Sequence, residues 1–201
     1  MYIFMAALNA GDEKTNVRGK GGARGAGNGK GVEKGEIKKY NTSASDFWTP
    51  QYLYDKLNDR FGPFDIDICA SDENTKCERY YTIDDDALKQ SWDGVCWCNP
   101  PYAVPTAKSI RGIVDVYIKK GLEEINNNEK CKRICFLIPC KTDVKYFHNF
   151  IFPNATELVF VKGRPNFAGP HSCNKASGCR TAICAVIFEK GKLGTQKYST
   201  L

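Results

Sequence analysis

A run of apolar residues that ends in Asn-Pro-Pro-Tyr combines the groups needed to hold a planar amino group during a transfer reaction. The run Val95 to Cys98 is typical of a short buried strand, and it must end at Pro100 and Pro101 because proline cannot donate to a sheet ladder. The carbonyl of Pro100 can then accept a hydrogen bond, and Asn99 adds a side-chain carbonyl beside it. Tyr102 offers a ring on which a base could stack. Two acceptors and a stacking surface match an exocyclic NH2 group, although Asn-Pro is also a common start of an ordinary turn.

A second candidate site follows an earlier strand. Residues 64–71 alternate between apolar and polar types and end in small residues, as a strand of an α/β sheet does where it enters a tight turn. Ligands bind at the carboxyl ends of such strands, and small side chains let them approach closely. Asp67, Ala70 and Ser71 are therefore candidate ligand contacts, although the glycine-rich signature expected for such a turn is missing.

Three adjacent carboxylates, Asp84 to Asp86, follow a short aromatic strand. Asp85 and Asp86 could accept hydrogen bonds from the hydroxyl or amino groups of a nucleoside. The cluster could also coordinate a hard cation, although no phosphate-binding loop accompanies it, or it could simply face water.

Thr49 and Pro50 mark the expected start of a helix, with Thr49 as the N-cap and Pro50 at the first helical position. A helix N-terminus favours carboxylates, so this pair could also contact an anionic group of a ligand. A capped core helix would explain the same letters. Apolar residues recur at helical spacing as far as Gly62-Pro63, namely Tyr52, Leu53, Leu57 and Phe61.

Strand-like and helix-like stretches alternate along the rest of the chain. Residues 108–125 carry apolar side chains at helical spacing, and residues 134–138, 157–161 and 181–188 are strand-like. This alternation predicts an α/β fold with a doubly wound, mostly parallel sheet. About thirty residues separate Asp67 from Asn99, which is too few for two crossover helices, so we expect the first half of the sheet to be abbreviated.

The length of 201 residues allows one ordinary domain and a tail. Residues 12–39 carry eight Lys and Arg against four acids, and this net charge of +4 accounts for most of the chain's net charge of +6. Their eight glycines and lack of apolar periodicity predict that residues 1–41 form a disordered arm, followed by a folded domain at 42–191 and a flexible tail at 192–201. The basic arm could bind a polyanion or serve as a solvated linker.

No apolar run approaches the roughly 18 residues that span a bilayer, and residues 1–8 lack the basic flank of a signal peptide. We therefore expect an intracellular protein without a membrane partner. Most of the ten cysteines fall on strand-like stretches, which suits buried reduced thiols. A zinc site from His171, Cys173, Cys179 and Cys184 is conceivable, but its spacing matches none of the tight paired-ligand patterns, so no metal is expected.

The Asn-Pro-Pro-Tyr tetrapeptide resembles the catalytic motif of S-adenosylmethionine-dependent methyltransferases that modify amino nitrogens. Over residues 46–190 the succession of motifs resembles the phage-type DNA N6-adenine methyltransferase (Dam) family. Several spaced motifs in one order are more specific than any single one. Lys141 stands where that family leads us to expect arginine, and Pro165 where it usually has an apolar residue. The matching motifs are Phe-Trp-Thr-Pro at 47–50, Asp-Ile-Asp-Ile-Cys-Ala-Ser at 65–71, Asn74 to Cys77, Tyr-Tyr-Thr at 80–82 with Asp85, Asp86 and Leu88, Trp-Cys-Asn-Pro-Pro-Tyr at 97–102, Ile138 to Asp143 with Phe147 and His148, Phe160 to Arg164 with Phe167, and Ala182 to Phe188.

The resemblance implies a Rossmann-like methyltransferase fold and S-adenosylmethionine as the methyl donor. It implies that Asn99 and the Pro100 carbonyl bind the two amino hydrogens of adenine, with Pro101 completing the motif and Tyr102 stacking on a base flipped out of DNA. The cofactor contacts that it implies, taken with the candidate positions above, are Trp48, Thr49, Pro50, Asp67, Ala70, Ser71, Asp85 and Asp86.

The expected partner is double-stranded DNA, bound by a monomer. No insertion is long enough to form a separate DNA-reading domain, so loops must make the contacts, with Lys141, Lys162, Arg164 and Arg180 as candidates. Scattered solubilising charge would explain any one of these four residues. The same motif also serves enzymes that methylate RNA bases, cytosine N4 or a protein glutamine amide, and a non-catalytic nucleic-acid-binding module is a further alternative.

Overall fold

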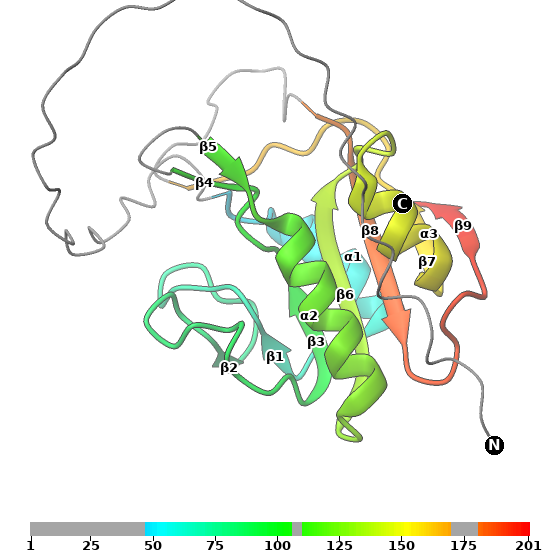
Figure 1. Cartoon of the computed structure of the whole chain (residues 1–201). Helices are drawn as coiled ribbons and strands as arrows, with labels where there is room; N and C mark the ends of the chain where they lie inside the picture. Colours follow the sequence, from blue (N-terminus) through cyan, green and yellow to red (C-terminus); the bar gives the residue numbers. More distant parts are fainter. Residues whose placement is uncertain (1–46, 106–109, 170–180) are drawn as a thin grey trace, which may run out of the picture. The chain divides into compact units, whose positions relative to one another are not determined.

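The computed structural model describes residues 47–105, 110–169 and 181–201, with the backbone alone described at 103–105 and 110–112. A seven-stranded sheet forms its centre, in the order β2-β1-β3-β6-β8-β7-β9 (Figure 1). Strand β8 runs antiparallel to both of its neighbours, and the other neighbouring pairs are parallel. The expected α/β sheet is thus confirmed, and its mixed character comes from β8. The strands are β1 (Ile66–Asp67), β2 (Arg79–Tyr80), β3 (Gly94–Cys98), β6 (Cys131–Pro139), β7 (Glu157–Phe160), β8 (Ile183–Glu189) and β9 (Lys197–Thr200).

Helices cover both faces of this sheet because successive residues of its central strands point to opposite sides. Helix α1 (Gln51–Phe61) packs on the face that contains Leu137. Helix α2 (Val114–Asn127) and the segment formed by η2 (Phe147–Ile151) and α3 (Phe152–Asn154) pack on the face that contains Phe136. Helix α2 lies so close to β6 that a Cβ at Gly121 would stand 2.6 Å from the Phe136 ring.

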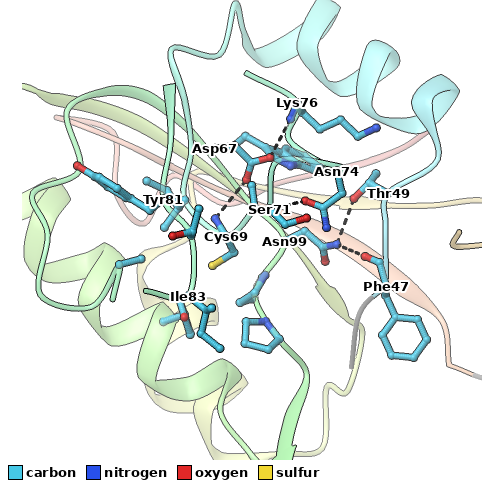
Figure 2. A pocket seen from close by; sticks show the side chains of 18 of the residues that line it. Phe47, Thr49, Asp67, Cys69, Ser71, Asn74, Lys76, Tyr81, Ile83 and Asn99 are labelled. Atoms are coloured by element: carbon cyan, nitrogen blue, oxygen red, sulfur yellow. Dashed lines mark hydrogen bonds between the residues drawn. The ribbon is translucent and has the colours of Figure 1, made fainter. Parts of the chain in front are cut away.

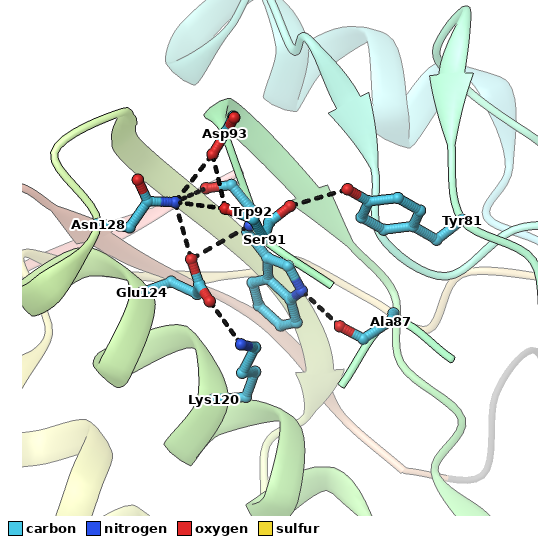
Figure 3. Close-up of polar contacts among 8 residues, drawn as sticks. All are labelled: Tyr81, Ala87, Ser91, Trp92, Asp93, Lys120, Glu124 and Asn128. Carbon is cyan, nitrogen blue, oxygen red and sulfur yellow. Dashed lines mark hydrogen bonds and ion pairs between the residues drawn. The ribbon is translucent and has the colours of Figure 1, made fainter. Parts of the chain in front are cut away.

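The first half of the sheet is abbreviated, as expected: between β1 and β3 the chain forms β2 and turns instead of a crossover helix. Trp92, which is fully buried, anchors this connection. Its indole Nε1 donates to the carbonyl of Ala87 at 2.9 Å, and its backbone N–H donates to the Glu124 carboxylate at 3.2 Å (Figure 3). Glu124 in turn accepts from Lys120 and Asn128, so a buried polar network ties the connection to α2.

Three expectations about the elements are wrong. Pro50 rather than Thr49 is the N-cap of α1, because its ψ of 137° is extended, and Thr49 makes no capping hydrogen bond. Tyr52 is exposed, and Tyr54 instead completes the buried face. The stretch 108–125 is not one helix: Ile110–Gly112 forms β5, which pairs antiparallel with β4 (Ala103–Pro105). Backbone pairing between these two strands outweighs the helical spacing of the apolar residues.

The prediction that residues 192–201 form a flexible tail is also wrong, because this stretch contains a strand of the sheet. Strand β9 within it pairs in parallel with β7, and the backbone N–H of Leu201 donates to Phe160 at 3.0 Å. The sheet edge therefore supplies hydrogen bonds that the composition of the tail does not reveal. The predicted arm at 1–41 lies outside the described residues, as do His171, Cys173 and Cys179 of the conceivable zinc site.

Within the described ranges, the structure has no helix long and apolar enough to cross a membrane. The eight cysteines in these ranges are free thiols. No group of three potential metal ligands occurs among the same residues.

Candidate active site

A cavity of about 510 Å³ opens where β1 and β3 end (Figure 2). This volume lies within the range of small-molecule sites, roughly 300–1,000 Å³. The walls come from five segments of the chain: the residues before α1, the turn after β1, the connection between β2 and β3, the motif after β3, and the start of α2. The cavity therefore lies at the carboxyl ends of parallel strands, where α/β sheets bind ligands. Of the residues predicted from sequence, those that line it are Trp48, Thr49, Asp67, Ala70, Ser71, Asp86, Asn99, Pro100 and Pro101.

The carboxamide of Asn99 is held in one orientation by two acceptors. Its Nδ2 donates to the backbone carbonyl of Phe47 at 2.7 Å and to the hydroxyl of Thr49 at 3.2 Å (Figure 2). Its Oδ1 is buried and has no hydrogen-bond partner among the described residues. A buried carbonyl without a donor is costly, and a ligand that brings an N–H group would satisfy it.

Asp67 organises the turn after β1. It is 3% exposed, and its two oxygens accept from the backbone N–H groups of Cys69 at 3.2 Å and Lys76 at 3.1 Å. Burial raises the pKa of Asp67 to about 6, against the lowering effect of these two hydrogen bonds. The loop is closed further by Asn74, whose side-chain carbonyl accepts from the backbone N–H of Ser71 at 2.8 Å.

The connection between β2 and β3 forms the opposite wall. Asp86 lines the cavity with a φ of 53°, and its carboxylate pairs with Lys89 at 2.7 Å. Asp85 is not among the lining residues. Its carboxylate accepts from the backbone N–H and the hydroxyl of Thr82, and these hydrogen bonds lower its pKa. Ile83, 64% exposed, adds an apolar surface to this wall.

The charges along the cavity are unevenly distributed. Among the described residues that line it, Lys76 carries the cationic side chain, whereas Asp67, Glu73 and Asp86 carry carboxylates. The Lys76 Nζ donates to Gln51 Oε1 at 2.9 Å, which places the cation beside the first residue of α1. The cavity thus offers one site for an anionic group and several acceptors for hydroxyl or ammonium groups.

Tyr102 does not line the cavity, unlike the rest of its motif. Its ring stacks on that of Phe47, with centroids 5.6 Å apart and planes 21° apart, and Phe167 meets it edge-on at 6.4 Å. Pro50 is not a lining residue either, although its carbonyl accepts the first hydrogen bonds of α1.

Exposed basic residues follow two strands, β6 and β7, which β8 separates in the sheet. Lys141 comes just after β6, and Lys162 and Arg164 come just after β7. Because β6 and β7 both run in the direction of β3, their carboxyl ends face the same side as Asn99. Arg180, the fourth predicted DNA contact, lies outside the described residues.

Sequence reasoning missed several residues that the fold brings to the cavity. Asn74 and Lys76 belong to a motif of the family resemblance, residues 74–77, but no sequence pattern predicts that their side chains line a cavity. Ile83 and Tyr117 come from turns and from a helix whose packing only the fold reveals. Phe47 belongs to the Phe-Trp-Thr-Pro motif, whose aromatic character was the available signal.

Known proteins resemble this chain over most of its length. A sequence profile described as "DNA N-6-adenine-methyltransferase (Dam)" matches residues 38–200. A DNA N-6-adenine-methyltransferase of Haemophilus phage HP1 is 30% identical over 170 residues, which cover 81% of this chain and 91% of that protein.

Two shorter matches agree with this result. A DNA N-6-adenine-methyltransferase of Escherichia phage T1 is 31% identical over 120 residues, covering 58% of this chain and 45% of that protein. The putative methyltransferase YfdM of Escherichia coli is 38% identical over 65 residues, covering 28% of this chain and 71% of that protein. The chain thus spans less than half of the phage T1 protein but nearly all of the phage HP1 protein.

Proposed function

The chain belongs to the DNA N-6-adenine-methyltransferase (Dam) family, and we propose that it transfers a methyl group from S-adenosylmethionine to the N6 amino group of adenine in DNA at the cavity beside Asn99. Membership of the family makes it a methyltransferase enzyme. The observation that supports this location is the Asn99 carboxamide, whose orientation is set by Phe47 and Thr49 while its carbonyl keeps a buried, unused acceptor.

The two amino hydrogens of adenine would be held by Asn99 Oδ1 and by the Pro100 carbonyl. When bound, S-adenosylmethionine supplies an electrophilic methyl group. With both hydrogens engaged, the N6 lone pair would point away from the ring plane. The new N6–methyl bond would replace the sulfur–methyl bond of the donor, S-adenosylhomocysteine would be the leaving group, and N6 would release one proton to water. The protein contributes position and fixed dipoles, which can lower a barrier by roughly 7–11 kcal/mol when the geometry is good.

The residues of the cavity fit the donor's chemical groups. Lys76 would bind its carboxylate, and the carboxylate of Asp86 would accept from ribose hydroxyls. Ile83 gives an apolar surface for the adenine ring. Asp67 acts indirectly, because both of its oxygens hold the backbone of the turn that lines the cavity.

DNA would reach the cavity across the carboxyl ends of β6 and β7, which Lys141, Lys162 and Arg164 follow. Phosphate contacts from such exposed cations position a duplex and weaken steeply with salt. N6 of a stacked base cannot reach a cofactor, so the target adenine must flip out toward Asn99. Double-stranded DNA is therefore the partner that we propose, with Arg180 as a fourth contact.

The test is Asn99→Ala, with Asn149→Ala, an exposed asparagine of η2, as the matched control. Purified variants are incubated with DNA and S-adenosylmethionine, and N6-methyladenine is measured by mass spectrometry of the digested DNA. We expect Asn99→Ala to lose methylation by at least about 100-fold, the scale of removing one preorganised polar group from an active site. The control should match wild type.

Full activity in a folded Asn99→Ala protein would refute the proposal. Parallel incubations with RNA and with protein distinguish the other amino-methyltransferases, since methyl transfer to either in place of DNA would replace the substrate proposed here. Calorimetry with S-adenosylmethionine detects a non-catalytic module, which would fail to bind the cofactor. Mapping the modified adenines then gives the target sequence.

A further inference from the structure

Phe47 both lines the cavity and stacks on Tyr102, the ring on which the target base would stack. It lines the cavity together with Asn99, Pro100 and Pro101, whereas Tyr102 does not line it. The Phe47 ring is nearly parallel to that of Tyr102, at a centroid distance of 5.6 Å. A ring that lines the cavity thus already covers one face of Tyr102.

From this arrangement we infer that Phe47 holds the place of the target adenine on Tyr102, so that the flipped base must displace the Phe47 side chain before it can stack. The inference rests on the proposed function and assigns Phe47 as a positioning residue that controls entry of the base.

The two rings leave no room for a third between them. Stacked aromatic planes lie roughly 3.5 Å apart, since that is the optimal contact distance between carbon atoms. A base sandwiched between two rings therefore requires centroids about 7 Å apart or more, and those of Phe47 and Tyr102 are 5.6 Å apart. Either the Phe47 ring leaves, or the walls separate.

Hydrogen bonds hold the backbone at Phe47, whereas its side chain is only partly buried. Its carbonyl accepts from Asn99 Nδ2 at 2.7 Å, and the next residue, Trp48, exchanges two backbone hydrogen bonds of 3.0 Å with Ala168. The Phe47 ring is partly exposed and meets Phe167 edge-on at 5.8 Å. Rotation of the side chain would uncover Tyr102 without disturbing the hydrogen bond that orients Asn99.

One residue therefore does two separable things. The peptide carbonyl of Phe47 orients the catalytic carboxamide, and its ring covers the stacking surface. A substitution removes the ring and keeps the carbonyl, so Phe47→Ala isolates the second role. Removing a competing aromatic pair should favour the stacked base by about 2- to 10-fold, the range of a single ring pair.

The experiment uses the full chain saturated with S-adenosylhomocysteine and a duplex with 2-aminopurine at a mapped target adenine, whose fluorescence rises when the base leaves the stack. We expect Phe47→Ala to bind this duplex about 2- to 10-fold more tightly than wild type, with a larger flipped fraction. In a Tyr102→Ala background the same substitution should bring no gain, because no stacking surface remains to be uncovered. Phe47→Tyr, which keeps a ring, should behave like wild type.

Weaker binding by Phe47→Ala would show that Phe47 is a second wall of the base site, and unchanged binding would show that the ring plays no part. Either result overturns the inference. If Phe47→Ala fails to fold by circular dichroism, Phe47→Leu takes its place with the same expectation, since leucine keeps apolar contact with Phe167 but cannot stack. If the wild-type protein flips and methylates the base but the Phe47 variants bind the duplex no more tightly, this inference is refuted and the proposed function remains intact.

Discussion

Replacing Lys76 should weaken binding of the methionine end of the cofactor and leave binding of its adenosine end unchanged. The Lys76 Nζ lies at the α1 side of the cavity, held by Gln51 at 2.9 Å, whereas Asp86 and Ile83 lie on the opposite wall. If the methionine carboxylate binds Lys76, then Lys76→Met removes a charge-assisted contact at that end alone. The methionine side chain keeps the length and apolar stem of lysine, so packing changes little.

The magnitude follows from the environment of Lys76. Hydrogen bonds to charged groups contribute about 1.5–3 kcal/mol, and solvent screening of a partly exposed cation favours the lower end. A loss of about 1.4 kcal/mol corresponds to a tenfold weaker Kd. We therefore expect the Kd of S-adenosylhomocysteine to rise about tenfold, and that of 5′-methylthioadenosine, which lacks the amino-acid group, to change less than about twofold.

Isothermal titration calorimetry with both ligands measures this difference. Lys56→Met, at an exposed position of α1 outside the cavity, is the matched control and should bind both ligands like wild type. Lys76→Arg should recover most of the affinity, since arginine also binds carboxylates. Equal weakening of both ligands by Lys76→Met, or no weakening of either, would refute the assignment of the carboxylate to this end of the cavity.

Two further predictions concern stability. Burial raises the pKa of Asp67 from 3.8 to about 6, so between these pH values the folded protein keeps a proton that the unfolded chain releases. The resulting stabilisation of the folded state is complete below about pH 4 and is lost as the pH rises through 6. Urea titrations at several pH values should show this loss in wild type but not in Asp67→Asn. Glu124→Ala should lower the free energy of unfolding by roughly 2–4 kcal/mol because the Trp92 N–H and Lys120 lose their buried acceptor. Glu123 is exposed on the same helix, so Glu123→Ala should change the free energy of unfolding by less than about 0.5 kcal/mol in the same titrations. An equal effect of both substitutions would refute the role of the buried network.

The sequence by itself determined the fold class and the motif. The continuous apolar run of β6 and the alternation of strands and helices depend on local composition, and the short distance from Asp67 to Asn99 limits the crossover whatever the packing. The Asn-Pro-Pro-Tyr motif is equally local, because two prolines end a strand in any context.

Local patterns failed where a segment's partner is distant in sequence. Residues 110–112 have helical spacing, but β4 provides a backbone partner for them, and β9 forms because the edge of β7 is open to it. Neither partner can be identified from the residues of the segment alone.

The tertiary structure alone decided how the motif residues are arranged. It turned the Thr49 hydroxyl toward Asn99 instead of the helix, covered Tyr102 with Phe47, and brought Lys76 to the cavity. The physical reason is that a residue's type limits the bonds it can make, whereas the choice among those bonds depends on which backbone and side-chain groups the fold places within hydrogen-bonding or stacking distance.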